Sequence, residues 1–275
     1  MFLVLFGAAL HATWNVIIKA GSDKQLDTIL ITCGAATIAG LALPFVPLPK
    51  TASWPYLGTS MVIHFAYFSL VALTYRTGEL SYVYPIMRGS APPLTAIAAA
   101  VTVGEPLSMG AWLGIALISA GILALTGDSW RSGRSSFGPA AFGLLNAVVI
   151  VAYTLVDGIG VRLSGNPWSY ILWLFILIPC PLLALVLFTR PQAFVSHIRT
   201  RWKPGFFGGV CTTASYGLAL WAMTVAPIAL IAALRETSVI FGTIFASLFL
   251  KERFGLVRIL AAGAVTLGAI VIKLW

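Results

Sequence analysis

Two arginines, Arg88 and Arg235, stand inside long apolar stretches and are the residues best suited to charged chemistry. A charged side chain at membrane depth costs at least about 2.5–3.5 kcal/mol on insertion scales, so it persists where it meets water, an anion or a carboxylate. A guanidinium binds a carboxylate through two parallel hydrogen bonds. Each arginine therefore either binds a substrate carboxylate or forms a structural ion pair with Asp157 or Glu236, and one arginine could play each role.

The neighbours of the two arginines separate these roles. Pro85 lies three residues before Arg88, and a proline removes a backbone donor and kinks a helix, so the chain there can bend and open to water. Glu236 follows Arg235 directly. We therefore assign Arg88 to the substrate carboxylate and Arg235 mainly to structure.

Prolines and buried acids suggest how such a site would move and be driven. Pro85, Pro92 and Pro93 interrupt one stretch and predict a bent gate beside a cavity; the alternative is a static kink set by packing. Asp157 and Glu236 are the acids placed deepest in apolar segments. Either could carry a coupling proton or neutralise an arginine.

Polar and aromatic residues recur at helical spacing along several apolar stretches, which places them on one face of each. Such stripes often serve packing alone, but an aromatic-lined cavity would suit flat or apolar substrates, or cations through cation–π contacts. The predicted substrate-binding residues are Trp14, Asn15, His64, Tyr67, Tyr75, Ser81, Tyr84, Arg88, Tyr153 and Tyr216. We expect His11 and His64 to be hydrogen-bonded interior residues, His197 to lie in a solvated basic loop, and no metal or cofactor to be bound.

The elements that hold these residues follow from composition. The 275 residues are 59% hydrophobic and 9% charged, whereas a soluble domain carries about 25% charged residues. A membrane-spanning helix needs roughly 20 apolar residues. The sequence therefore predicts an all-α membrane protein of ten transmembrane helices. They fall at 2–20, 27–47, 55–76, 80–102, 107–126, 137–161, 167–188, 204–224, 227–249 and 254–274, with the longest loops at 127–136 and 189–203.

An internal repeat divides the chain into residues 1–126 and 137–275, joined by a polar linker at 127–136. At an offset of 147 residues, Arg88 falls on Arg235, Glu105 on Glu252 and Gly121 on Gly268. Because each half has an odd number of helices, the halves must have opposite orientations. An inverted repeat of this kind places a binding site near the membrane midplane.

Basic residues predict the orientation. Of the 17 Lys and Arg residues, twelve fall in loops on one side of the predicted helices and three on the other. The positive-inside rule then places both termini outside and explains the net charge of +9 without nucleic acid. We expect a multi-pass monomer of a bacterial inner membrane whose partners are the lipid bilayer, a small-molecule substrate and a coupling proton.

The two halves resemble the drug/metabolite transporter superfamily, in particular its EamA-type ten-helix exporters. The resemblance is carried by ALTYRTGELSYVYPIMRG at 72–89, by the Gly-Glu at 104–105 and by the Lys-Glu-Arg at 251–253. It implies export of small metabolites, and the aromatic stripes favour amino acids, including aromatic ones. The alternatives are export of cationic drugs and a non-transporting or lipid-handling role. The chain has no phosphate loop, dinucleotide fingerprint or zinc-protease motif, so we expect no enzyme activity.

Overall fold

The protein is a bundle of α-helices in this computed structural model, which describes residues 1–77, 80–127, 137–250 and 255–274, with the backbone alone at 74–77, 80–81, 137 and 246–250. The helices are α1 (Phe2–Ala20), α2 (Lys24–Ala42), α3 (Trp54–Thr77), α4 (Leu80–Thr102), α5 (Met109–Ala124), α7 (Phe137–Leu163), α8 (Pro167–Leu177), α9 (Pro179–Thr189), α10 (Pro191–Met223), α11 (Ile228–Arg235), α12 (Ser238–Leu250) and α13 (Leu256–Leu274). Two 3-10 turns, η1 (Leu43–Phe45) and η2 (Thr51–Ser53), connect α2 to α3. The predicted all-α fold class is confirmed.

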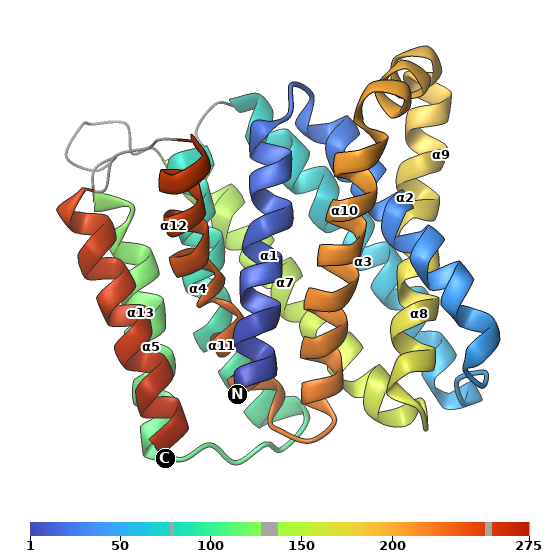
Figure 1. Ribbon diagram of the computed structural model, residues 1–275. Coiled ribbons are helices and arrows are strands. Elements are labelled where there is room, and N and C mark those ends of the chain that lie inside the picture. The colour runs from blue at the N-terminus through green and yellow to red at the C-terminus, as the bar shows by residue number, and fades with distance from the viewer. Residues whose placement is uncertain (78–79, 128–136, 251–254, 275) are drawn as a thin grey trace.

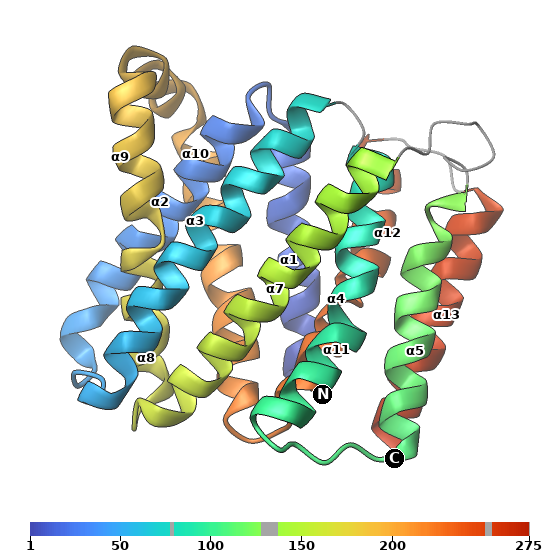
Figure 2. The ribbon, with the colours of Figure 1, turned by 180° about the vertical axis from the view of Figure 1, so that it is seen from behind.

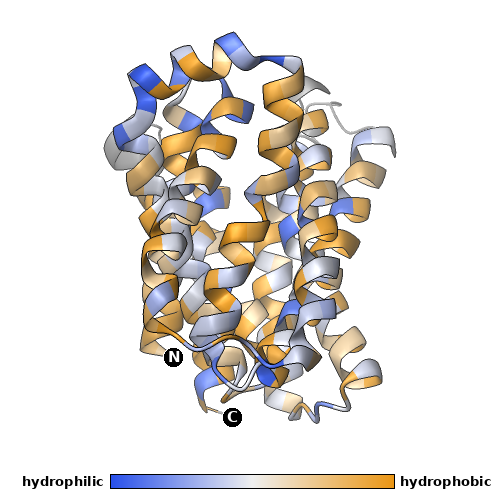
Figure 3. Ribbon diagram, turned by 90° about the vertical axis from the view of Figure 1, so that its right-hand side faces the viewer, coloured by the Kyte–Doolittle hydropathy of each residue, from blue (hydrophilic) through white to orange (hydrophobic). Residues whose placement is uncertain are grey.

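The helices are long and apolar enough to cross a membrane. Eight segments of the described chain meet that length and hydropathy, and α5 is a shorter apolar helix. The more polar α4, with Arg88 and three prolines, lies between them in the bundle (Figures 1 and 2). Large side chains such as Phe45 and Phe188 are 87% and 90% exposed, as lipid-facing residues would be. Figure 3 shows hydrophilic segments gathered mainly at the end opposite the two termini.

Three predicted boundaries are wrong. The stretch 189–203 is not a loop, because α10 begins at Pro191 and continues to Met223. The predicted helix 167–188 is two helices that meet at Ile178, where Pro179 removes a backbone donor. The predicted helix 227–249 is interrupted at Glu236 and Thr237, between α11 and α12. Broken helices of this kind recur at the binding sites of transporters.

Helices of the two halves pack against each other in corresponding pairs. α1 packs on α10 and α12, whereas α7, its predicted counterpart, packs on α3 and α4. α2 packs on α10, and α8 packs on α3. If each helix is replaced by its counterpart in the other half, α1–α10 becomes α7–α3, α1–α12 becomes α7–α4, and α2–α10 becomes α8–α3. A two-fold axis in the membrane plane would produce this pattern. The division into inverted repeats stays a prediction to which this pattern adds support.

α5 and α13 lie antiparallel along one side of the bundle (Figure 1) and approach through glycines. A Cβ on Gly268 would lie 2.6 Å from the Gly114 carbonyl oxygen, and one on Gly114 would lie 2.7 Å from the Gly268 oxygen. A Cβ on Gly121 would lie 2.9 Å from the Ala261 oxygen. Gly114 and Gly268 thus allow the close packing of α5 on α13, whereas a Cβ on Gly263 would contact nothing within 4 Å.

We expect Gly268→Ala to lower the thermal stability of the detergent-solubilised protein, because the backbone of α5 must move away. Overpacking of this kind costs about 1–3 kcal/mol. Gly263→Ala, on the same helix, is the matched control and should be neutral or stabilising, since alanine favours a helix by about 1 kcal/mol over glycine. Equal melting temperatures for the two variants would contradict the close crossing of α5 and α13.

Candidate functional site

A cavity lies at the centre of the bundle and consists of two adjoining pockets that share Trp14, Thr28, Tyr67 and Phe68. Seven of the ten predicted substrate-binding side chains line it: Trp14, Asn15, His64, Tyr67, Tyr84, Tyr153 and Tyr216. The remaining lining is polar at His11, Thr28, Thr32, Asn146, Thr212 and Arg235, and apolar at Ile18, Ile31, Phe68, Val71, Val83, Met87, Phe175 and Ile178. The two pockets hold about 30 and 60 Å³ of space for water, so a metabolite can enter only after helices move.

Arg235 is the arginine that faces the cavity. Its guanidinium carbon lies 4.6 Å from the centroid of the Tyr216 ring, at cation–π distance. Among the described residues, no carboxylate lies within ion-pair distance of it. Arg235 is the last residue of α11, where the helix dipole favours a positive charge. A half-buried guanidinium in this setting is suited to bind an anion.

Arg88 forms the buried ion pair instead. Its Nε atom lies 2.8 Å from Oε2 of Glu236, and the two side chains are 3% and 5% exposed. Glu236 precedes α12, whose N-terminus favours a negative charge. An ion pair of Glu236 with an arginine is one of the two predicted alternatives, and Arg88 forms it. The assignment of Arg88 to a substrate carboxylate and of Arg235 to structure therefore loses its support.

Asp157 has neutral partners. Its two carboxylate oxygens accept hydrogen bonds from the Tyr170 hydroxyl at 2.9 Å and the Tyr216 hydroxyl at 2.6 Å. The residue is fully buried, and no cation of the described chain lies within ion-pair distance. Its predicted role as the partner of an arginine is thus not met. Tyr216 touches both groups, so Arg235, Tyr216 and Asp157 form a continuous chain of contacts.

His64 packs at the same place and carries its own hydrogen bond. Its Nδ1 lies 3.0 Å from both the carbonyl oxygen and the hydroxyl oxygen of Ser60, and the tautomer decides which hydrogen bond forms. The imidazole lies over Tyr153, with ring centroids 4.4 Å apart. This matches the expected hydrogen-bonded interior histidine.

Two polar groups of the lining have no hydrogen-bond partner. They are the Trp14 indole nitrogen and both amide atoms of Asn146. Asn15, by contrast, donates to the His11 carbonyl oxygen of its own helix at 2.8 Å. Asn146 was not among the predicted substrate-binding residues. It lies seven residues before Tyr153, which puts both residues on one face of α7. Since unpaired buried polar atoms are costly, these atoms are available to a ligand.

The remaining predicted residues are placed as follows. The side chains of Tyr75 and Ser81 lie outside the described part of the chain. α4 continues through Pro85, Pro92 and Pro93 from Leu80 to Thr102. Their gating role stays a prediction.

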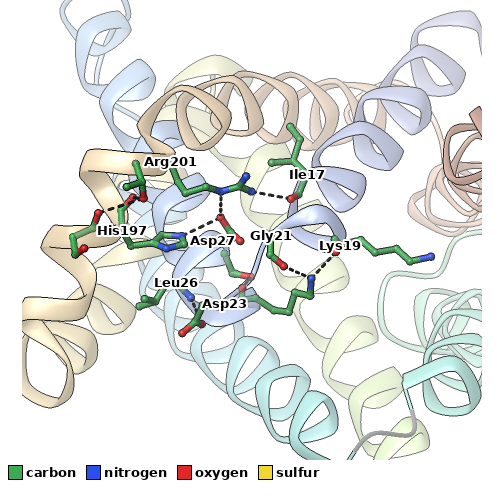
Figure 4. A network of polar contacts seen from close by, with 12 residues as sticks. Ile17, Lys19, Gly21, Asp23, Leu26, Asp27, His197 and Arg201 are labelled. Carbon is green, nitrogen blue, oxygen red and sulfur yellow. Dashed lines mark hydrogen bonds and ion pairs between the residues drawn. The ribbon is translucent and has the colours of Figure 1, made fainter. Parts of the chain in front are cut away.

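A polar network connects α1, α2 and α10 (Figure 4), at the end of the bundle away from the termini (Figure 1). Oδ1 of the buried Asp27 accepts from His197 Nε2 at 3.0 Å and from Arg201 Nε at 3.1 Å. Arg201 also donates to the Ile17 carbonyl oxygen. A Cβ at Gly21 would collide with the Asp27 carboxylate. The expected solvated position of His197 is wrong, because the predicted loop is the first part of α10, where His197 faces Asp27 of α2.

Asp23 begins α2 beside this network. Its side chain accepts from the Leu26 N–H and pairs with Arg190 at 2.7 Å. Partial burial raises the pKa of the Asp23 carboxyl, but these two donors outweigh burial and hold the pKa below its usual value.

Glu105 ties the opposite end. It accepts from the Ile228 N–H at 3.0 Å, which caps α11, and from Arg162 at 2.6 Å. Arg162 also donates to the carbonyl oxygens of Met223 and Ala226. Glu105 does not cap α5, the helix that follows it, since Ser108 does so. Glu252, its counterpart at the offset of 147 residues, lies outside the described residues.

Three comparisons with known proteins find similarity to a family, to a relative and to a solved structure. Residues 139–274 match the EamA-like transporter family. A stretch of 113 residues is 29% identical to the uncharacterized protein y4nH of Sinorhizobium fredii (strain NBRC 101917 / NGR234), covering 40% of this chain and 91% of that protein. A protein of known crystal structure shares the fold with a TM-score of 0.73 at 17% identity, over 99% of this chain and 94% of its own.

Proposed function

This chain belongs to the EamA-like transporter family through residues 139–274, and we propose that it is a secondary exporter of small carboxylate-bearing metabolites, aromatic amino acids among the candidates, that works by alternating access through the central cavity. We place it in a bacterial inner membrane, and the distribution of Lys and Arg supports an orientation with both termini outside.

The position of Arg235 carries this proposal. Its guanidinium reaches the cavity, has no carboxylate partner among the described residues and lies on an aromatic ring. An arginine at membrane depth is maintained where it gains an anion or water. A substrate carboxylate would supply the missing charge, and the surrounding rings would contact an apolar body. Cationic drugs, the alternative substrate class, would be repelled by the Arg235 guanidinium.

Ion pairs that connect helices at both ends of the bundle support alternating access. The network of Asp27, His197 and Arg201 holds one end of the bundle, and the pair of Glu105 and Arg162 holds the other. Transport requires that each end open in turn while the other stays closed around the site. The break between α11 and α12 lies beside Arg235 and offers a position where one half of the helix can move.

Asp157 is the residue we assign to a coupling proton. Glu236 is less suited to that role, because its ion pair with Arg88 favours the charged carboxylate. A fully buried carboxylate that has only neutral donors is unfavourable while it is charged, because no cation compensates for its desolvation. Taking up a proton removes this desolvation cost. Because Tyr216 contacts both Asp157 and Arg235, protonation would reposition the ring that supports the substrate site.

The test is exchange of a labelled aromatic carboxylate by the purified protein in liposomes. We expect Arg235→Gln to reduce exchange by about tenfold or more, because a hydrogen bond to a charged group contributes about 1.5–3 kcal/mol. Arg235→Lys should retain part of the activity, since the charge remains but the planar fork is lost. Arg199→Gln, on the exposed face of α10, is the control. Full exchange by Arg235→Gln would refute the carboxylate role.

A further inference from the structure

The charges that face the central cavity narrow the substrate class, and this step rests on the proposed function. Among the described lining residues, Arg235 is the one whose side chain is always charged. The described lining contains no aspartate, glutamate or lysine. Of the histidines in the lining, His64 is buried and His11 is half-buried. The cavity is therefore positively charged and has no built-in anion.

Two acids beside lining residues, Glu236 next to Arg235 and Asp157 in contact with Tyr216, already have partners. Glu236 is engaged by Arg88 at 2.8 Å, and its side chain is 5% exposed. Asp157 accepts from Tyr170 and Tyr216 and has no exposed surface. Neither residue lines the cavity. A substrate ammonium group would find no carboxylate there.

Neutral groups of the lining compensate only in part for the absence of a carboxylate that could bind a substrate ammonium group. Arg235 covers one face of the Tyr216 ring, and His64 covers one face of Tyr153, so these faces are closed to a second cation. The unpaired amide of Asn146 offers an oxygen that would accept a hydrogen bond from an ammonium group. A neutral oxygen does not balance the charge, and a buried charge without a partner is strongly unfavourable.

We infer that the cavity prefers monoanionic carboxylic acids with an aromatic or apolar body and no ammonium group over the corresponding zwitterionic amino acids. One carboxylate would neutralise Arg235, and the electrically neutral complex would fill a cavity of rings and hydroxyls. The polar atoms of Trp14 and Asn146 would then bind a second neutral group of the substrate, such as a hydroxyl or a carbonyl.

Four compounds of nearly equal shape test this inference: phenylpropionate, phenylalanine, phenylpropionamide and phenethylamine. Calorimetric titration of the purified full-length protein in detergent should show that phenylpropionate binds more tightly than phenylalanine by about tenfold or more, because only phenylalanine buries an unpaired charge. The neutral amide should bind more weakly than the acid, and Arg235→Gln should abolish the difference between acid and amide.

The outcomes separate the inference from the proposed function. Equal or tighter binding of phenylalanine would overturn the preference for monoanions and leave carboxylate transport intact. If phenylpropionamide binds as well as phenylpropionate, or if phenethylamine binds most tightly, both proposals fail, because Arg235 would then not select a carboxylate. Binding of none of the four compounds would also overturn both.

Discussion

Arg88→Gln should reduce the free energy of unfolding by about 3–5 kcal/mol, the cost of leaving one member of a buried ion pair without its partner. The two side chains are 3% and 5% exposed, so water cannot replace the lost guanidinium beside Glu236. Most of the protein should fail to accumulate in membranes, and the remainder should melt at a clearly lower temperature. Yield and thermal melting in detergent measure both effects.

The double variant Arg88→Gln/Glu236→Gln is the matched control. It removes both charges, and two neutral amides of similar size can hydrogen-bond each other, so much of the lost stability should return. Arg235→Gln should melt close to the parent protein, because it leaves no buried carboxylate unpaired among the described residues. If Arg88→Gln is as stable as the parent and loses substrate binding instead, the roles of the two arginines are those predicted from sequence.

Asp157→Asn should abolish proton-driven accumulation of substrate while exchange without a gradient persists. Asparagine has the shape of the protonated acid and cannot release a proton, so the transporter would lose its dependence on pH. The carbonyl oxygen of asparagine still accepts a hydrogen bond from Tyr216 or Tyr170, which protects the fold. Uptake into liposomes with and without an imposed proton gradient distinguishes the two activities.

Tyr170→Phe is the control for this variant. It removes one donor to Asp157 but keeps the carboxylate, so accumulation should still follow the gradient. Accumulation by Asp157→Asn equal to that of the parent would assign the proton to another group or make the transport facilitated.

The sequence predicted most of the apolar spans and most of the cavity lining, but it did not predict the breaks at Ile178 and at Glu236 and Thr237. Length and hydropathy located the helices, because lipid requires long apolar segments. Helical spacing grouped Trp14, His64, Tyr153 and Tyr216, since these faces must point into the bundle. Spacing within one helix carries no information about the partner on another helix, and so the partners of Arg88 and Arg235 were exchanged.

Residues beyond the spans were harder to place for a related reason. His197 and Arg201 lie in a basic stretch that resembles a loop, and their attachment to Asp27 depends on the direction in which α10 extends past the apolar segment. Glu105 begins one apolar helix in sequence but caps α11, which is more than 120 residues away. Contacts at such separation follow from tertiary packing alone.

The crossing of α5 and α13 bears on how such a chain could have arisen. Adding 147 to one partner and subtracting it from the other turns the contact of Gly114 with Gly268 into that of Gly121 with Ala261. Both contacts would thus form between two identical half-length chains inserted in opposite directions, as a self-complementary dimer interface.

The relative from Sinorhizobium fredii has a suitable length for that arrangement. The 113 matched residues make up 91% of it, so it is shorter than one half of this chain and cannot hold two five-helix units. Duplication and fusion of such a gene would convert a dimer of copies with dual topology into one polypeptide. Each half could then diverge, and Arg88 and Arg235, which correspond at the offset of 147 residues, would become free to take different tasks.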